Sequence, residues 1–304
     1  MDTVPPNRND IRDFLISRRA LLSPGDVGLP AGTRRRVAGL RREEVAVLSG
    51  VSTEWYTRLE KGHITGVSEE VLGAVAHALQ LSEDERDYLF DLAKAARPSV
   101  RPRQRPKENP VDGPVQWLLD SISMSAAFLR NGRLDVVASN SLARALHVPM
   151  FESPTAQGER ANFARFHFLD PVAREFFIDW ESGAGATVAL LRAEAAREPG
   201  DRALRELIGE LSTASADFRK MWAAQNVRSR HEGLKRLQHP VVGYIELTYQ
   251  SADLANTTRS ARGLNLYSAA PGSADEDRLK VLSSWAATNS DVAADRSEPH
   301  SARE

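Results

Sequence analysis

The stretch from Arg42 to Leu59 has the residue types of two short helices that cross tightly around a turn. Ala46 is small enough to let the helices approach, Gly50 accepts the backbone angles of a tight turn, and Ser52 can cap the second helix. The apolar residues that then share the buried side of the pair are Val45, Val51, Tyr56 and Leu59. A helix-turn-helix places its second helix in the major groove of DNA, so the predicted chemistry is the contact with base edges and phosphates that a transcription regulator makes.

The flanking sequence predicts the helices that must hold this pair in place. Apolar residues recur at helical spacing over 11–22, Ser68 precedes a second amphipathic stretch, and Ser82 with Glu85 forms a capping box that opens another helix. A loop rich in Gly, Pro and Arg, at 23–39, separates the first helix from the pair. These patterns predict five helices within residues 11–96, which form one all-α DNA-binding domain.

The composition limits the function classes. The chain has 304 residues, which favours about two domains, and no cysteine, which excludes disulfides, thiolate metal sites and cysteine nucleophiles. Residues 1–107 carry three more basic than acidic side chains and residues 108–304 four more acidic than basic ones, so we expect DNA binding in the first part only. The sequence has neither a long apolar run nor the apolar core of a signal peptide, so we expect no membrane span and a cytoplasmic location.

A Pro- and Arg-rich stretch at 97–112 is the clearest boundary in the chain. Its prolines disfavour a helix, so we predict an extended linker. Its basic side chains either trail along phosphates or are simply solvated. A second domain is then expected at 113–288, followed by a disordered tail at 289–304.

The second domain mixes helical and strand patterns. Asn131-Gly132 between apolar runs predicts a β-hairpin at 126–138, and Asn140 can cap the helix that follows. Helical patterns come next at 162–181, 184–197 and 201–225, then strand patterns at 234–237, 241–249 and 264–269, and a last helix at 275–287. A hairpin, then helices, then three strands predict an α+β fold with one antiparallel sheet covered by helices.

Short motifs in both parts resemble one family in their order along the chain. The helix-turn-helix resembles the XRE, or lambda-repressor-like, type, and the whole set resembles the MmyB-like subfamily of actinobacterial regulators. The motifs span about residues 11–288 and are Asp26-Val27-Gly28-Leu29-Pro30, Arg34-Arg35-Arg36, Gly39-Leu40-Arg41-Arg42-Glu43-Glu44-Val45-Ala46, Trp55-Tyr56-Thr57-Arg58-Leu59-Glu60, Phe168-Leu169-Asp170-Pro171, Asp179-Trp180-Glu181, Leu191-Arg192, His239-Pro240-Val241-Val242-Gly243 and Ala270-Pro271-Gly272-Ser273. The resemblance implies an XRE domain followed by a PAS-like ligand-binding domain. It implies a regulator that binds double-stranded DNA, and we expect that regulator to act as a homodimer.

The resemblance also implies which residues face DNA. The base-facing positions are Ser52, Thr53, Glu54, Thr57 and Arg58. Arg58 could pair with guanine and Glu54 could accept from cytosine, although the helix dipole also favours a carboxylate at a helix start. The phosphate candidates, of which we expect at least two to act, are Arg34, Arg35, Arg36, Arg41 and Arg42. Arg19 and Glu60 resemble the buried ion pair that ties the first helix to the third in this fold.

The second domain is rich in aromatic residues. Most belong to a core, but PAS-like folds often hold a small molecule between sheet and helices, so a subset could contact a ligand. The candidates are Phe128, Phe163, Phe166, Phe176, Trp180, Trp222, Tyr244 and Tyr267. Composition and analogy favour an apolar ligand, such as a fatty acid or a polyketide-like metabolite.

Two other functions stay open at this point. The second domain could dock a protein partner instead of a small molecule, in which case we expect a large exposed apolar patch. A fused enzyme would need a catalytic motif, and the sequence has no Walker A, Gly-x-Ser-x-Gly, zinc or complete dinucleotide pattern, so we assign no catalytic residue. We expect no metal and no cofactor, because His167, His231 and His239 lack ligand spacing. His239-Pro240 instead predicts a bend between two strands.

Overall fold

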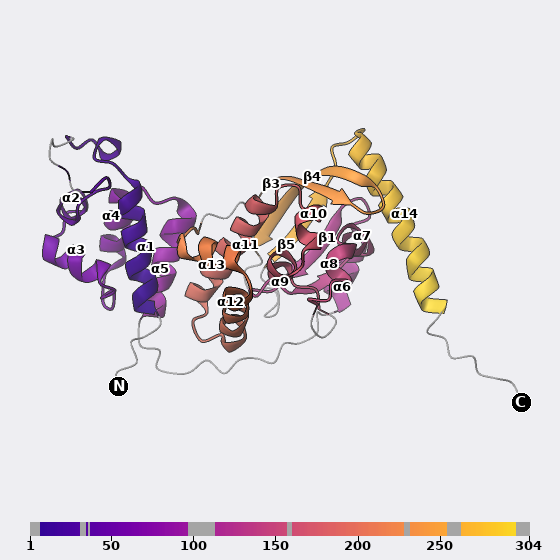
Figure 1. The fold of residues 1–304 in the computed structure, drawn as a ribbon, viewed down its shortest axis with the longest axis horizontal. Coiled ribbons are helices and arrows are strands. Elements are labelled where there is room, and N and C mark those ends of the chain that lie inside the picture. Colours follow the sequence, from indigo (N-terminus) through magenta and orange to yellow (C-terminus); the bar gives the residue numbers. More distant parts are fainter. Residues whose placement is uncertain are drawn as a thin grey trace, which may run out of the picture. The chain divides into compact units, whose positions relative to one another are not determined.

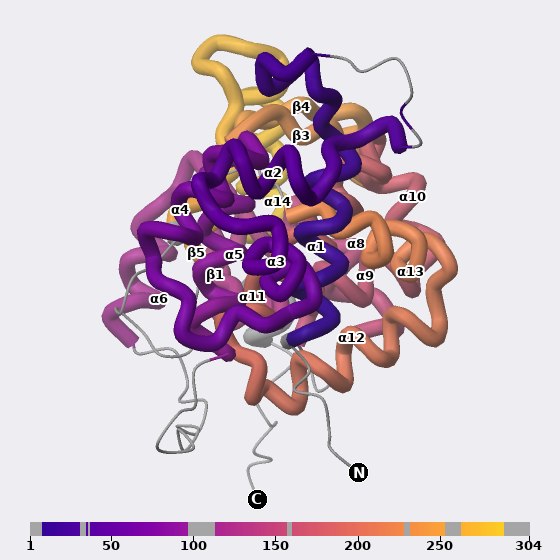
Figure 2. Tube along the Cα trace, turned by 90° about the vertical axis from the view of Figure 1, so that its left-hand side faces the viewer, coloured from indigo at the N-terminus to yellow at the C-terminus, as the bar shows by residue number. Residues whose placement is uncertain are grey.

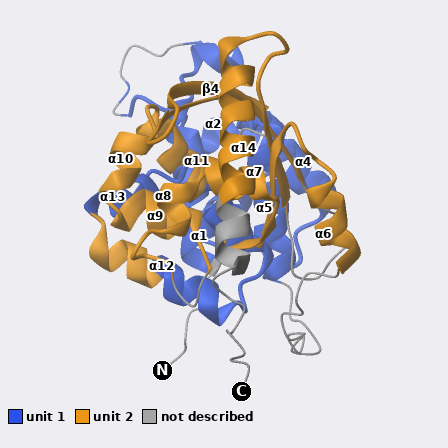
Figure 3. Ribbon diagram, turned by 90° about the vertical axis from the view of Figure 1, so that its right-hand side faces the viewer, with its two compact units in different colours: residues 1–103, 188–208, 216–229 blue, residues 104–187, 209–215, 230–304 orange. Residues whose placement is uncertain are grey.

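The computed structural model of the chain describes residues 7–30, 35, 37–96, 113–156, 160–227, 232–253 and 263–295. These residues belong to two compact units (Figure 3). The first unit combines residues 1–103 with 188–208 and 216–229, and the second combines 104–187, 209–215 and 230–304. Two segments from late in the chain therefore belong with the N-terminal helices. The predicted domains are continuous stretches of sequence, unlike these units, and their boundaries remain a prediction.

The N-terminal part of the first unit is all-α, as predicted (Figures 1 and 2). Its helices are α1 Asn7–Leu21, α2 Arg42–Leu48, α3 Thr53–Glu60, α4 Glu69–Ala78 and α5 Glu83–Ala95, with a short 3-10 helix, η1, at Gly25–Val27. The side chains of Ser52, Ser68 and Ser82 cap α3, α4 and α5. The capping box of α5 is complete, because the Glu85 carboxylate accepts a hydrogen bond from the Ser82 backbone nitrogen at 2.9 Å.

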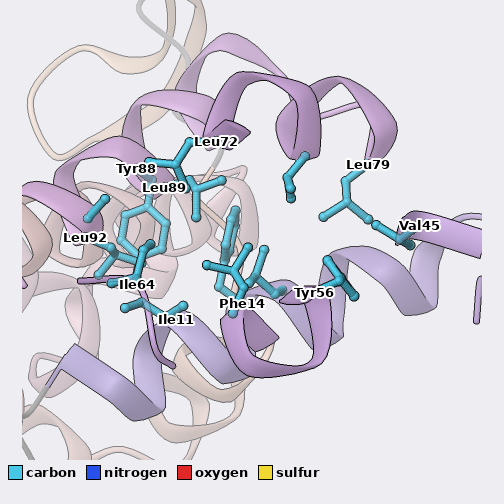
Figure 4. Close-up of a cluster of buried hydrophobic side chains, with 14 of the residues drawn as sticks. Ile11, Phe14, Val45, Tyr56, Ile64, Leu72, Leu79, Tyr88, Leu89 and Leu92 are labelled. Atoms are coloured by element: carbon cyan, nitrogen blue, oxygen red, sulfur yellow. The ribbon is translucent and has the colours of Figure 1, made fainter. Parts of the chain in front are cut away.

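A hydrophobic core fills the space between these helices (Figure 4). Phe14 of α1 meets Tyr88 of α5 edge-on, with ring centroids 5.0 Å apart. Where α2 and α3 cross, Ala46 is 1% exposed, and Gly50 has a φ of 67°, a left-handed conformation that favours glycine. The predicted helix-turn-helix is therefore confirmed, together with the reason for its small residues.

Helices from later in the chain complete this unit. They are α11 Trp180–Arg197, α12 Arg202–Ala214 and α13 Ala216–Ala223. Residues 188–197 of α11, 202–208 of α12 and all of α13 belong to the first unit. Ala196 and Val227 are buried in the same hydrophobic core as α1–α5. The helical pattern predicted over 201–225 is present but breaks at Ser215.

The second unit contains a five-stranded sheet with strand order β2-β1-β5-β4-β3. The strands are β1 Ala126–Arg130, β2 Val136–Ser139, β3 Glu232–His239, β4 Gly243–Asp253 and β5 Gly263–Ser268. All neighbouring pairs are antiparallel, so the predicted α+β class and the hairpin at Asn131-Gly132 are confirmed. The predicted bend also follows His239, whose Nδ1 accepts a hydrogen bond from the Val241 backbone nitrogen at 3.1 Å.

Helices lie against both faces of the sheet, because successive residues of a strand point to opposite sides. Phe128 of β1 faces α7 Ser141–Leu146 and α9 Phe163–Leu169, through ring contacts with His147 and Phe163. Ala127 and Leu129 face the other way, toward Leu119 of α6 Gly113–Asp120. The remaining helices of the unit are α8 Val148–Phe151, α10 Val172–Phe176 and α14 Ala274–Asp295. On the side of the sheet that Phe128 faces, its ring stacks with those of Phe163 and Tyr267.

Two predicted helices have different bounds in the structure. The stretch at 162–181 is divided into α9, α10 and the start of α11, because Asp170 and Pro171 turn the chain. The Asp170 carboxylate accepts hydrogen bonds from the Val172 nitrogen at 2.9 Å and from the Ser153 hydroxyl at 2.5 Å. The last helix, predicted to end at 287, continues to Asp295, so residues 289–295 of the predicted tail are helical. Residues 296–304 lie outside the described part of the chain.

Asn140 joins the hairpin to the helix that follows it. Its Oδ1 accepts hydrogen bonds from the nitrogens of Ala127, at 3.0 Å, and Ala143, at 2.8 Å. Its Nδ2 donates to the carbonyls of Ile122, at 2.7 Å, and Ser125, at 2.9 Å. The residue is 3% exposed, so water cannot replace these bonds. The predicted helix cap is confirmed, and it also fixes the start of β1.

We expect Asn140→Ala to lower the free energy of unfolding by about 3 kcal/mol, because four backbone groups lose a buried partner together. Urea unfolding measures this difference. The exposed neighbour Ser141→Ala is the control and should change stability by no more than about 0.5 kcal/mol. An equal effect of the two substitutions would contradict the joining role of Asn140.

Candidate nucleic-acid interface and ligand site

Helix α3 presents the predicted base-facing residues on its outer side. Ser52, Thr53, Glu54 and Arg58 are exposed, and Thr57 is half-buried. Ser52 is also the cap of the helix, since its hydroxyl accepts from the Trp55 nitrogen at 3.1 Å. The opposite side of α3 is buried through Tyr56, Leu59 and Glu60. Trp55 is partly buried against the core, as expected for a residue at the domain edge.

Glu60 fixes α3 to the two other helices of the motif. Its side chain is 1% exposed. Arg19 of α1 donates to it from Nε at 2.8 Å and from Nη2 at 3.1 Å, which confirms the pair implied by the family resemblance. Arg42 of α2 also donates to it, from Nε at 2.8 Å, while remaining 46% exposed. One buried carboxylate thus holds three helices in register, and Arg42 still reaches the surface.

The predicted phosphate candidates divide into different groups. Arg35 is half-buried: its guanidinium bonds to the Glu44 carboxylate at 2.6 and 2.9 Å and to the Gly39 carbonyl at 2.8 Å. Arg41 and Arg42 are exposed at the start of α2. Arg34 and Arg36 lie outside the described residues. Arg35 therefore holds the loop against α2, and Arg41 and Arg42 are the described candidates that face solvent.

An aromatic cluster lies between the sheet and the helices of the second unit. We define it as Phe128, His147, Phe163, Phe176 and Tyr267. The His147 ring centroid lies 5.6 Å from that of Phe128, 5.5 Å from Phe163, 6.2 Å from Phe176 and 5.2 Å from Tyr267. Phe128 and Phe163 stack with centroids 4.9 Å apart. Four of the eight predicted ligand residues therefore surround one buried histidine that the sequence did not single out.

Two buried imidazoles bring unpartnered acceptors into this region. Nδ1 lies 3.3 Å from the Ala143 carbonyl in His147 and 3.1 Å from the Phe163 carbonyl in His167. A carbonyl oxygen only accepts, so Nδ1 must carry the proton and Nε2 of each neutral ring is an acceptor. Both Nε2 atoms are buried without a hydrogen-bond partner in the part of the chain that the structure describes. Burial lowers the pKa of His147 to about 4 and that of His167 to about 3, so both rings are neutral at pH 7.

The side chain of Lys235 and the backbone of Gly183 lie beside His167. A Cβ atom built on Gly183 would stand 2.8 Å from Nε2 of His167 and 3.7 Å from Nζ of Lys235. Lys235 also lies over the Tyr249 ring, 5.2 Å from its centroid, and burial lowers the pKa of its amine. The start of α11 therefore approaches both polar groups closely, and a side chain at position 183 would collide with the imidazole.

The other predicted ligand residues lie in several places. Phe166 packs against Phe176 at the edge of the aromatic cluster, with centroids 6.1 Å apart. Trp180 is buried nearby, and its indole donates to the His167 carbonyl at 3.0 Å. Trp222 belongs to the first unit. Tyr244 is 44% exposed and hydrogen-bonds to Glu246 at 3.2 Å. Tyr244 is therefore not a member of the aromatic cluster, and Trp222 belongs to a different unit.

A signal in the sequence could have placed Tyr244 correctly. It alternates along β4 with Ile245 and Leu247, which are both fully buried, so its side chain must point to the opposite face. His147 gives no comparable signal, since a lone histidine at a helix end is ordinary. Among the described residues, no cluster of three His, Asp or Glu side chains is arranged to hold a metal ion. None of the described helices combines the length and hydropathy that a membrane span requires.

Two family models match the chain. A helix-turn-helix domain model matches residues 31–89, which include α2, α3 and α4. A model described as the MmyB-like transcription regulator ligand binding domain matches residues 111–282, more than half of the chain. This second match contains the sheet, the aromatic cluster and helices α11–α13. No curated protein matches the chain.

The ion pair between Arg35 and Glu44 predicts a pH effect on the first unit. The hydrogen bond from Arg35 lowers the pKa of Glu44 from 4.5 to about 2. The native state therefore releases this proton more readily than the unfolded state, so the stabilisation is complete above about pH 4.5 and is lost as the pH falls toward 2. We expect the difference in urea midpoint between wild type and Glu44→Gln to be largest at pH 7 and to shrink steadily below pH 4.5.

Glu43→Gln is the matched control, because Glu43 is exposed in the same turn of α2. A difference between wild type and Glu44→Gln that stays constant from pH 7 to pH 2.5 would contradict the pairing.

Proposed function

The chain belongs to the MmyB-like transcription regulator family, and we propose that a small, largely apolar ligand in its C-terminal domain modulates its affinity for DNA. The chain is a DNA-binding transcription regulator, since a helix-turn-helix domain accompanies the family's ligand-binding domain. The observation that carries the ligand proposal is the aromatic cluster, in which a buried histidine offers an acceptor that no described group occupies.

We propose that α3 reads bases through its exposed face. Arg58 is exposed and could make a bidentate contact with guanine, and Glu54 could accept from cytosine. Arg41 and Arg42 at the start of α2 supply phosphate contacts, which position the protein but carry no sequence information. We further propose a homodimer on a pseudo-palindromic site, because such sites mirror the two-fold symmetry of a dimer.

The chemistry of the aromatic cluster favours a particular kind of ligand. The stacked rings of Phe128, Phe163 and Tyr267 would give a ligand at this cluster an apolar aromatic surface. Nε2 of His147 and of His167 would accept a hydrogen bond, so a ligand with a hydroxyl or another donor satisfies groups that otherwise pay a desolvation cost. Phe166, Phe176 and Trp180 stay in this proposal, whereas Trp222 and Tyr244 are left out of it.

An exposed apolar surface supports the alternative in which the C-terminal domain docks a protein partner. Trp117 and Leu118 of α6 are 72% and 62% exposed, and Met124, just beyond this helix, is 49% exposed. Large apolar side chains grouped on a surface are typical of interaction sites. Native mass spectrometry of wild type and His147→Phe separates ligand binding from partner docking.

Substitutions at the DNA surface should have two distinct effects. We expect Arg58→Ala to weaken binding to a duplex selected from a random library by about tenfold and to relax the sequence preference, as the loss of a base contact does. Arg41→Ala should weaken binding to all duplexes alike and reduce the slope of log K against log salt by about 1. Anisotropy titrations at several salt concentrations measure both effects.

Arg205→Ala is the control for this experiment, because Arg205 is exposed on α12 and lies outside the helix-turn-helix. A loss of affinity with Arg58→Ala that leaves the sequence preference unchanged would contradict base reading by Arg58.

Native mass spectrometry tests the ligand. We expect the purified protein to carry an added small mass that denaturation releases, and we expect His147→Phe to lose it, since phenylalanine keeps the ring but removes the acceptor. Tyr244→Phe, which changes an exposed residue of the same sheet, should retain the added mass. Equal retention by wild type and His147→Phe, or no added mass in either, would contradict a ligand held at this cluster and favour the docking of a partner.

A further inference from the structure

Arg192 on α11 is the largest fully buried side chain of the described residues, at 1% exposure. Its Nη1 donates to Oε1 of Gln225 at 2.6 Å, and its Nη2 donates to the carbonyl of Trp222. Its guanidinium lies over the Trp222 ring, 4.2 Å from the centroid. These bonds hold α11 to α13 and the residues just beyond it. All of these residues belong to the first compact unit.

The same guanidinium acts on the N-terminal helices of this unit. Burial raises the pKa of Tyr88 on α5 to about 12, and the nearby charge of Arg192 opposes that rise. Burial also raises the pKa of Asp10 on α1, again against the charge of Arg192. Arg192 therefore sits where α11, α1 and α5 meet.

A second arginine reaches back from the N-terminal helices. Nη1 of Arg18 on α1 donates to Glu85 on α5 at 2.6 Å, and its Nη2 donates to the backbone carbonyl of Gln225. Gln225 thus accepts from Arg192 with its side chain and from Arg18 with its backbone. Its φ of 54° turns the chain after α13 so that both acceptors are available. The residue is 7% exposed, so these bonds are shielded from water.

Apolar and rim contacts surround this polar centre. Ala196 and Val227 are buried in one hydrophobic cluster with Phe14 and Leu92 of the N-terminal helices. At the rim, Nε of Arg197 lies 3.6 Å from the Asp91 carboxylate, and both side chains are partly exposed. The contact therefore has a buried centre, an apolar surround and a solvated edge, as an interface between docked elements has.

This interface leaves the DNA-reading surface free. The contacts involve α1 and α5, whereas Thr53, Glu54 and Arg58 are exposed on α3. In Figure 1, α3 lies on the side of the helical bundle that is far from α13. Docking of α11 and α13 therefore cannot act by covering the recognition helix. It can act by fixing the orientation of the bundle that carries this helix.

We propose that residues 188–208 and 216–229 form a docking element that binds the α1 and α5 face of the helix-turn-helix bundle and sets how its recognition helix is presented to DNA. Arg192 is the positioning residue of this interface. Helix α11 contributes to both compact units, since it begins with Trp180 and Gly183 beside His167 and ends in the docking element. Transmission of a ligand signal along α11 rests on the proposed function, but the docking itself does not.

The polar centre makes the docked state reversible. The desolvation penalty of a buried guanidinium offsets much of the free energy that its hydrogen bonds contribute. The two acceptors of Arg192 within the docking element, Gln225 Oε1 and the Trp222 carbonyl, are both neutral. The net stabilisation from such a centre is small, although the removal of one partner is costly. An interface of this kind favours one geometry without making it permanent, as a transmission element requires.

Hydrogen exchange of the full-length protein tests the docking. We expect Arg192→Ala to raise exchange rates at least threefold in peptides from α1, α5 and α13, and to leave those from α2 and α3 within twofold of wild type. Gln225→Gly should act in the same way, because glycine keeps the left-handed backbone and removes only the side-chain acceptor. Lys280→Ala, which removes an exposed pair with Asp277 on α14, outside the docking element, is the control.

The spacing of DNA half-sites tests the positioning role. On a selected duplex with two half-sites, we expect one inserted base pair to cost wild type at least tenfold in affinity. It should cost Arg192→Ala less than threefold, while affinity for a single half-site stays within twofold of wild type. A merely structural role would not change the spacing preference in this way.

Three outcomes would overturn the proposal. They are unchanged exchange in α1 and α5, equal acceleration across all of α1–α5, and a spacing preference in Arg192→Ala equal to that of wild type. If Arg192→Ala does not fold, Gln225→Gly decides both measurements. If wild type binds no duplex, the proposed function fails, and the exchange data still decide whether the element docks.

Discussion

The buried carboxylate of Glu60 is the group on which the orientation of α3 depends. A carboxylate at 1% exposure needs cationic partners, and it takes one from α1 and one from α2. Helix α3 cannot rotate or slide without breaking bonds to both helices. The exposed side of α3 is therefore held in a fixed direction by a group on its buried side. Arg42 serves in this arrangement and is still 46% exposed, so one residue belongs both to the buried ion pair and to the surface.

Local signals predicted much of the first unit. Ser52, Ser68 and Ser82 mark helix starts because a side-chain cap needs only neighbours in the chain. The pairing of Arg19 with Glu60 was expected from family resemblance alone, since no periodic pattern relates the two residues. The pairing of Arg35 with Glu44 was not expected, because an arginine-rich loop looks the same whether its cations face phosphates or fold back on a carboxylate.

The second half of the chain shows what periodicity leaves out. The helical patterns at 184–197 and 201–225 predicted helices, but such a pattern does not say which surface covers them. The structure places Ala196 and Val227 in the core of the N-terminal helices. Composition likewise predicted an aromatic interior without ranking its members. Four different elements supply the rings that surround His147. Which rings come together there depends on the tertiary fold and cannot be deduced from a local pattern.

The central strand of the sheet is the last one that the ribosome makes. β5 lies between β1 and β4, so the sheet stays in two pieces until residue 268 has been synthesised. Helices α2 and α3 lie within residues 42–60, so their mutual contacts can form while the sheet is still being translated, whereas Ala196 and Val227 join the core of that unit later. A nascent chain would therefore contain the helix-turn-helix pair before it contains the complete sheet. A chain that stopped before residue 263 would keep the helix-turn-helix pair and lack the strand that joins the two halves of the sheet.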